Sequence, residues 1–174
     1  DFGQAESDEV IVNFSAQETF YSEKRAFFNE NQSLFDLSHY DRYRIINTRR
    51  IGAKSSYDCG NSIDEDECNN AKKSYTDIDF ALRYTQKNLN SDLGVFVAQE
   101  SDESFTRGKN FYAVRSKTKV NNRSIGYFLT HVVDNFTNEK ATVNVVDFTN
   151  IKSDKLTLYN DILFSEKEGD NGLG

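Results

Sequence analysis

The sequence predicts an α+β fold in which one N-terminal α-helix packs on an antiparallel β-sheet. Apolar residues recur with a helical period near the start of the chain and with a period of two after residue 75. Turn-forming residues separate the later segments, and 14 Phe and 9 Tyr can supply one packed core for the 174 residues. We therefore expect a single domain over residues 1–174, with a helix at about 9–29, an irregular αβ-loop at about 30–74, a sheet at about 75–164 and a polar tail at 165–174.

The predicted N-terminal helix carries two apolar stripes on neighbouring faces. One stripe contains Val10, Phe14, Tyr21 and Phe28, and the other contains Val12, Ala16, Phe20 and Phe27. A helix that covers one sheet needs a single apolar stripe about 100° wide. Two stripes predict two packing partners, while a helix sunk deeply in its own core is the alternative interpretation.

The αβ-loop holds both cysteines, Cys59 and Cys68, in the segment "CGNSIDEDEC". A disulfide between them would stabilise the fold by about 2–3 kcal/mol in the chain-entropy estimate, and it would indicate an oxidising, exported location. Two free thiols are the alternative. The same segment contains four consecutive acidic residues, Asp64, Glu65, Asp66 and Glu67. A calcium site formed by them is a weaker hypothesis than a solvated acidic loop, because they lack EF-hand spacing. We otherwise predict no metal and no cofactor.

The sheet is predicted from alternation in "YTDIDFALRY" (75–84), where Phe80, Leu82 and Tyr84 alternate with Ala81 and Arg83. Such a pattern is typical of a strand with one buried face and one face in water. Further strands are expected at 93–99, 110–120, 124–133 and 141–148, and the segment 155–164 is ambiguous. The short connections between them favour a meander.

The composition disfavours nucleic acid as a partner, because a net charge of −7 repels phosphates. The basic cluster is interpreted as the solvated face of a strand; it comprises Arg42, Arg44, Arg49 and Arg50. His131 lies within a predicted strand and His39 lies in a loop. No known catalytic motif is present. We therefore predict that the protein is not an enzyme.

The segment "SAQETFYSEKRAFF" followed by "YDRYRI" resembles the soluble headgroup of a type IV pilin, of the type IVa deltaproteobacterial or myxobacterial kind. The matching residues are Ala16, Gln17, Phe20, Tyr21, Ser22, Glu23 and Lys24, with Phe27 or Phe28 near the next family aromatic, and with Tyr43 and Arg44 in the following strand. Downstream, Phe111 and Ala113 match a pilin and pseudopilin pattern, and Tyr127 lies near its aromatic position.

This resemblance implies a structural subunit of an extracellular type IV pilus (fimbrium) that supports twitching motility and surface attachment. The implied partners are other pilin subunits in a homopolymer, the pilus assembly machinery, and a surface, host or prey ligand. One helix stripe would pack on the sheet and the other on neighbouring subunits. Membrane contact would come only through a hydrophobic helix half that this sequence lacks, as expected for a trimmed chain without a starting Met.

Two alternatives remain open. A minor pilin or a type II secretion pseudopilin would share the fold and would cap or prime a filament. A periplasmic assembly or binding domain would combine a helix with a curved sheet and a ligand groove.

Overall fold

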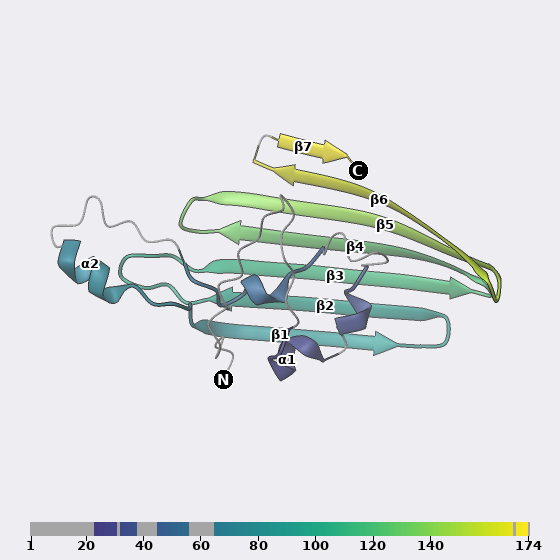
Figure 1. Cartoon of the computed structure of the whole chain (residues 1–174), viewed down its shortest axis with the longest axis horizontal. Helices are drawn as coiled ribbons and strands as arrows, with labels where there is room; N and C mark the ends of the chain where they lie inside the picture. Colours follow the sequence, from purple (N-terminus) through teal and green to yellow (C-terminus); the bar gives the residue numbers. More distant parts are fainter. Residues whose placement is uncertain (1–22, 31, 38–44, 56–64, 169, 174) are drawn as a thin grey trace.

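The computed structural model describes residues 23–30, 32–37, 45–55, 65–168 and 170–173, and its main feature is one antiparallel sheet (Figure 1). The short helices are α1 (Ala26–Asn29), η1 (Gln32–Leu34), η2 (Thr48–Arg50) and α2 (Glu65–Ala71). The strands are β1 (Ile78–Lys87), β2 (Ser91–Glu100), β3 (Lys109–Val120), β4 (Arg123–Asp134), β5 (Glu139–Ser153), β6 (Leu156–Lys167) and β7 (Asp170–Leu173).

The seven strands follow one another in sequence order, so every connection joins neighbours. Two connections contain Asn in the left-handed region, Asn121 with φ 52° and Asn138 with φ 59°. Asn tolerates this conformation better than most residues, which suits it to the tight turns that join strands. The meander order agrees with the sequence prediction, and the ambiguous segment 155–164 forms most of β6. The tail, expected to be a polar end, instead contributes the end of β6 and β7.

The α+β prediction is wrong, because the described chain is mostly β-strand and no N-terminal helix packs on the sheet within it. Residues 9–22 of the predicted helix lie outside the described residues. Over 23–29, only the single turn Ala26–Asn29 is helical. The physical reason is tertiary: Arg25, which precedes this turn, has an extended backbone and donates to the carbonyls of Ile51 and Thr48. Within the turn, Phe28 inserts into the core beside Phe96, with ring centroids 5.9 Å apart.

The core lies between one face of the sheet and a covering segment formed by residues 23–30, 32–37 and 45–55 (Figure 1). Its buried side chains are Phe28, Leu34, Phe35, Leu37 and Ile51 from the covering segment, and Phe96, Ala98, Ala113, Phe128 and Val145 from the sheet. The covering segment approaches β2 closely at Gly94. A Cβ added there would lie 2.7 Å from Phe35 Cζ and 2.8 Å from Leu34 Cδ2. The close packing of η1 therefore requires glycine at this position.

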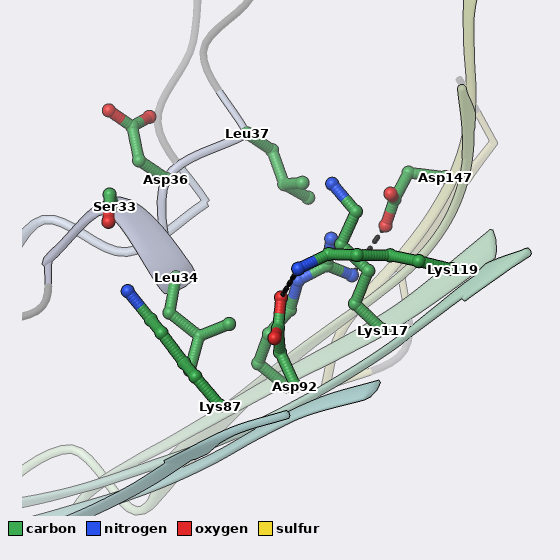
Figure 2. A pocket seen from close by; sticks show the side chains of 10 residues that line it. Ser33, Leu34, Asp36, Leu37, Lys87, Asp92, Lys117, Lys119 and Asp147 are labelled. Carbon is green, nitrogen blue, oxygen red and sulfur yellow. Dashed lines mark hydrogen bonds and ion pairs between the residues drawn. The ribbon is translucent and has the colours of Figure 1, made fainter. Parts of the chain in front are cut away.

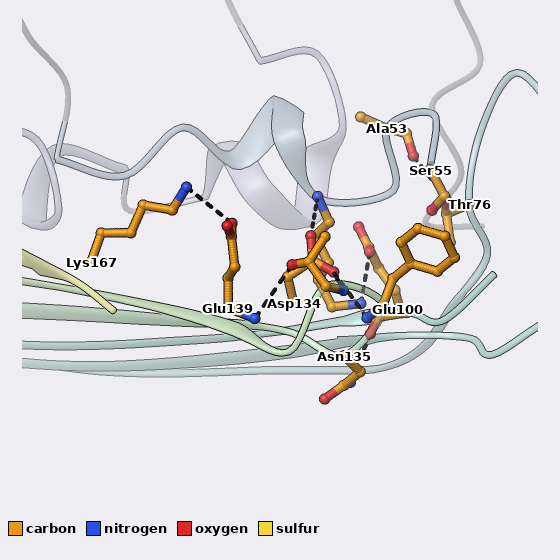
Figure 3. Close-up of polar contacts among 12 residues, drawn as sticks. Ala53, Ser55, Thr76, Glu100, Asp134, Asn135, Glu139 and Lys167 are labelled. Carbon is orange, nitrogen blue, oxygen red and sulfur yellow. Dashed lines mark hydrogen bonds and ion pairs between the residues drawn. The ribbon is translucent and has the colours of Figure 1, made fainter. Parts of the chain in front are cut away.

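Polar side chains fasten the covering segment to the sheet. The carboxylate of Glu100 accepts hydrogen bonds from the backbone N–H of Gly52 at 2.8 Å and of Lys109 at 3.0 Å (Figure 3). Arg83 of β1 donates from Nη2 to the carbonyl of Phe28 at 2.9 Å and from Nη1 to that of Glu30. These bonds satisfy carbonyl and amide groups that the irregular covering segment cannot pair by itself.

Within the covering segment, Glu23 and Arg25 form a buried ion pair at 2.8 Å. Arg25 also donates to the carbonyls of Ile51 and Thr48, both at 2.7 Å, and the Thr48 hydroxyl donates to Glu23 Oε2 at 2.8 Å. Its guanidinium lies 4.0 Å from the centre of the Phe28 ring. This network joins the two ends of the covering segment without regular secondary structure.

Candidate functional site

The sheet has two faces of different character, and we use the names covered face and open face for them. The covered face carries the side chains that meet the covering segment, such as Phe96 and Ala113. Side chains of directly paired residues point to the same side of a sheet, and successive residues point to opposite sides. The register therefore assigns Val97 and Tyr112 to the open face, together with their cross-strand partners.

Three consecutive cross-strand rows on the open face contain no charged residue. The first row is Tyr84, Val95, Val114, Leu129, Asn144 and Phe164; the second is Gln86, Leu93, Ser116, Tyr127, Val146 and Ile162; the third is Ser91, Thr118, Ile125, Phe148 and Asn160. Charged side chains reappear on this face only towards the strand ends, at Arg123, Lys140 and Glu166. The open face is thus an uncharged band across six strands.

The large side chains of the open face, inside the band and beyond it, are exposed. Phe80 is 49% exposed, Tyr84 51% and Ile162 52%. The others that exceed a third of full exposure are Leu82, Leu93, Tyr112, Val120, Ile125, Tyr127, Val146, Phe148, Leu158 and Phe164. The sequence analysis assigned the apolar side of the first strand to the buried face, and this assignment is wrong. The covering segment packs instead on the side that carries Arg83, so the apolar side does not meet this described segment.

Several polar groups of the open face bond to one another. The Tyr127 hydroxyl donates to Asn144 Oδ1 at 2.6 Å, and His131 Nδ1 lies 2.8 Å from Thr142 Oγ1. The ring of Tyr112 lies beside that of His131, with centroids 6.0 Å apart. Cross-strand pairing of this kind reduces the cost of removing hydroxyl, amide and imidazole groups from water.

The pKa values of two carboxyl groups on the covered side shift in opposite directions. Burial raises the pKa of Glu100, and the N–H groups of Gly52 and Lys109 only partly oppose this. Burial acts in the same sense on Glu23, but hydrogen bonds from Arg25 and Thr48 hold the pKa of Glu23 below its usual value. Burial lowers the pKa of Arg83. These groups act as structural attachments of the covering segment.

The structure brings together few of the residues selected from the sequence. Of the two helix stripes, only Phe27 and Phe28 lie within the described residues. Their rings meet edge to face at 5.1 Å, and Phe28 is fully buried. The remaining stripe residues lie outside the described residues: Val10, Phe14, Tyr21, Val12, Ala16 and Phe20. Packing of this region against a second partner stays a prediction.

The segment around the cysteines contains a helix rather than only a loop. Glu65–Ala71 form α2, in which Cys68 is fully buried while Asp66 and Glu67 are exposed. Residues 65–71 contain no Gly, no Pro and no β-branched residue, which allows this helix to form. Cys59 and Asp64 lie outside the described residues, so the disulfide stays a prediction. In the described part of the chain, no group of three or more His, Cys, Asp or Glu side chains is placed to hold a metal ion.

The basic cluster is only partly described. Arg49 and Arg50 lie in the 3-10 turn η2 rather than on a strand, while Arg42 and Arg44 lie outside the described residues, as does His39. His131 lies on β4 in the open face. The open face itself was missed as a site, although the alternation and the absence of charges in the alternate positions of 80–86, 110–120 and 125–133 were readable signals.

Fold and site together define an antiparallel β-sheet domain with a hydrophobic core and buried charges on its covered face and an exposed apolar band on its open face. Residues 1–157 match the model of a family described as "Domain of unknown function (DUF5916)", and the chain belongs to this family. No curated protein and no solved structure matches the chain. The pilin resemblance is therefore wrong, since both the matched family and the nearly helix-free architecture of the described chain differ from a pilin. Among the described residues, no helix is long and apolar enough to cross a membrane.

Proposed function

We propose that this chain is a lipid-contacting structural domain, whose open face packs against the acyl chains of a lipid assembly. The observation that carries this proposal is the uncharged band of three cross-strand rows, flanked by charges towards the strand ends. Assembly into a pilus rests on the resemblance alone and stays a prediction.

The area of the band supports an apolar environment. With about 150–250 Å² per aromatic side chain and exposures of 37–51%, the six exposed aromatic residues of the whole open face present on the order of 500 Å². The largest apolar patch on a typical monomer in water is about 300–600 Å² in total. The exposed Leu, Ile and Val side chains of the open face add to the aromatic area. Water is therefore an unfavourable solvent for this face.

The length of the uncharged strand segments supports lipid rather than a second protein. On two strands the uncharged open-face residues extend beyond the three rows of the band, from Ile125 to Val133 on β4 and from Asn110 to Val120 on β3. At about 3.3 Å per residue these segments are about 26 and 33 Å long. The hydrocarbon core of a bilayer is about 30 Å thick. Charged residues near the ends of the band would then lie at the polar headgroups.

The backbone at the outer edge of the sheet sets a condition on this arrangement. Among the described residues, no strand neighbours the outer edge of β1, which carries backbone N–H and C=O groups. Hydrocarbon offers these groups no hydrogen-bond partner. We therefore expect this edge to pair with another strand in the lipid-bound state.

The experiment places a single tryptophan on the open face, since the chain contains no other Trp. Val146→Trp lies at the centre of the band, and Lys155→Trp lies in the turn between β5 and β6 as the matched control. In vesicles whose acyl chains carry bromine, we expect quenching of Trp fluorescence at position 146 and little quenching at position 155. Equal quenching at both positions, or none at either, would contradict the proposal.

A second copy of the chain is the competing occupant of the open face. Light scattering measures the mass of the purified chain without lipid and with a mild detergent. A stable dimer that detergent does not dissociate, with no bromine quenching at position 146, would assign the face to protein–protein contact.

A further inference from the structure

A cavity of about 200 Å³ lies on the covered face, between residues 33–37 of the covering segment and the ends of β1, β2 and β3 (Figure 2). It lies on the opposite side of the sheet from the open face, so it is independent of the lipid proposal. Its floor follows one cross-strand row, in which Lys87, Asp92 and Lys117 are direct neighbours on three strands. The next positions in this row are Gly126 and Asp147.

Arg115 reaches across Gly126 to Asp147. Its Nη1 donates to Asp147 Oδ1 at 2.5 Å, and both side chains are only 2% exposed. A Cβ at position 126 would lie 2.7 Å from Arg115 Nη2, so glycine is needed for the guanidinium to pass. The guanidinium carries five N–H donors, and the carboxylate of Asp147 accepts from Nη1 only.

Two buried polar atoms of residues that line the cavity have no hydrogen-bond partner among the described residues. One is Arg115 Nε, a donor, and the other is Asp92 Oδ1, an acceptor. The second oxygen of Asp92 pairs with Lys119 Nζ at 2.6 Å. Buried polar groups without a partner are uncommon and point to an unseen polar ligand. This ligand must offer both an acceptor and a donor.

The charge of the cavity favours an anion. Four cations line it, Lys87, Arg115, Lys117 and Lys119, against the three carboxylates of Asp36, Asp92 and Asp147, which gives 4 − 3 = +1. Lys87 and Lys117 form no ion pair with any residue that the structure describes. Two ammonium groups and a guanidinium at one small cavity match the oxygens of a tetrahedral oxyanion.

We propose that this cavity binds a hydrogenphosphate group. Its oxygens accept from the Nε–H of Arg115 and from the ammonium groups of Lys87 and Lys117, and its P–OH donates to Asp92 Oδ1. The group belongs either to free phosphate or to the phosphomonoester headgroup of a lipid, since the chemistry is shared. The carboxylate of Asp92 makes the cavity selective between anions. It accepts a hydrogen bond from an anion that carries an O–H group and repels an anion that carries none.

The first test titrates the full native chain with inorganic phosphate and with sulfate by isothermal calorimetry at pH 7, without lipid. Phosphate carries an O–H at this pH and sulfate does not. We expect saturable phosphate binding and at least tenfold weaker sulfate binding. Absence of saturable phosphate binding, or equal affinity for the two anions, would overturn the proposal. This test requires no substitution.

The second test uses two double variants with the same change in charge. Lys87→Gln with Lys117→Gln removes the two cavity cations, and Lys152→Gln with Lys155→Gln removes two exposed cations near the β5–β6 turn. We expect the first to weaken phosphate binding at least tenfold and the second to change it less than twofold. Equal effects would show general charge attraction and overturn the site. Thermal melts by circular dichroism verify that both variants fold.

Competition separates the two sources of the phosphate group. Phosphatidylcholine vesicles with and without phosphatidic acid are added to the phosphate-loaded chain. Displacement of phosphate only by the vesicles with phosphatidic acid would support the site and assign it to a lipid headgroup. No displacement by either would support it as a site for free phosphate.

Discussion

The two faces of the sheet are formed by the same strands, but their side chains differ in exposure to solvent. On β5, Val145 is fully buried and its neighbour Val146 is 38% exposed. On β3, the charged side chain of Arg115 is buried while the aromatic side chain of Tyr112 is exposed. Exposure in this sheet therefore follows the location of the covering segment and not the hydrophobicity of the side chain. The covered face tolerates charges because they are paired, as in Arg115–Asp147.

The open face and the covered face are suited to different surroundings. A face in water commonly carries charges in its centre. The centre of the open face carries none, whereas the covered side holds buried charges at Asp92, Arg115 and Asp147. An apolar face that the described covering segment leaves exposed indicates another apolar partner. The following four predictions test this difference, beginning with the largest expected effect.

Removal of one partner of the buried ion pair should have the largest effect on the covered face. Asp147→Ala leaves the guanidinium of Arg115 buried without its carboxylate, and we expect a loss of about 3–5 kcal/mol in the free energy of unfolding. Urea denaturation followed by circular dichroism measures it. The double variant Arg115→Met with Asp147→Leu should recover most of the loss, because no charge remains buried. A single variant as stable as the native chain would contradict the structural role of the pair.

A charge at the centre of the open face should act on lipid binding and not on the fold. Val146→Lys is expected to cost about 2.5–3.5 kcal/mol in transfer to a bilayer centre, while the stability in water changes by less than about 0.5 kcal/mol because the side chain is already exposed. Vesicle flotation and urea denaturation measure the two quantities. As control, Lys152→Glu changes a charge near the end of β5. A large loss of stability in water with unchanged flotation would reverse the assignment of the faces.

A methyl group under the covering segment should weaken its packing. Gly94→Ala places a Cβ against Phe35 and Leu34, and we expect a loss of about 1–3 kcal/mol, typical of overpacking. Ser116→Ala on the open face is the control and should change stability by less than about 0.5 kcal/mol. Denaturation midpoints measure both. If Gly94→Ala has no effect, η1 does not pack on β2 as described.

The ion pair of the covering segment should produce the smallest effect, and it should depend on pH. The pKa of Glu23 in the fold is below its ordinary value of 4.5, so its stabilisation is present above that pH and is lost as the pH falls through the folded pKa. Glu23→Gln should cost about 1–2 kcal/mol at pH 7. The difference from the native chain should shrink below pH 4.5, as followed by thermal melts from pH 7 to pH 3. A difference that is constant with pH would exclude the charged form of Glu23 as its cause.

The strands could be predicted from the sequence, because alternation and turn residues are local signals. Residues 110–120 and 124–133 lie almost within the bounds of β3 and β4. The region before residue 75 could not be predicted equally well. Its aromatic residues have a helical period, yet Phe28 and Phe35 serve as single insertions into a core formed by distant strands. The phosphate cavity could not be found either, since Lys87, Arg115 and Asp147 are far apart in the sequence.

The sequence by itself determined the two-sided strands, their order and the uncharged character of one side, because side-chain direction alternates with every residue of a strand. Only the tertiary structure decided which side is buried. The covering segment packs on the face that contains Gly94, Ala98 and Ala113, where small residues leave room for its aromatic side chains. Beside these positions the open face carries the larger side chains Leu93, Val95, Val97 and Tyr112. Alternation specifies that two faces differ, whereas steric fit between distant segments specifies which of them is covered.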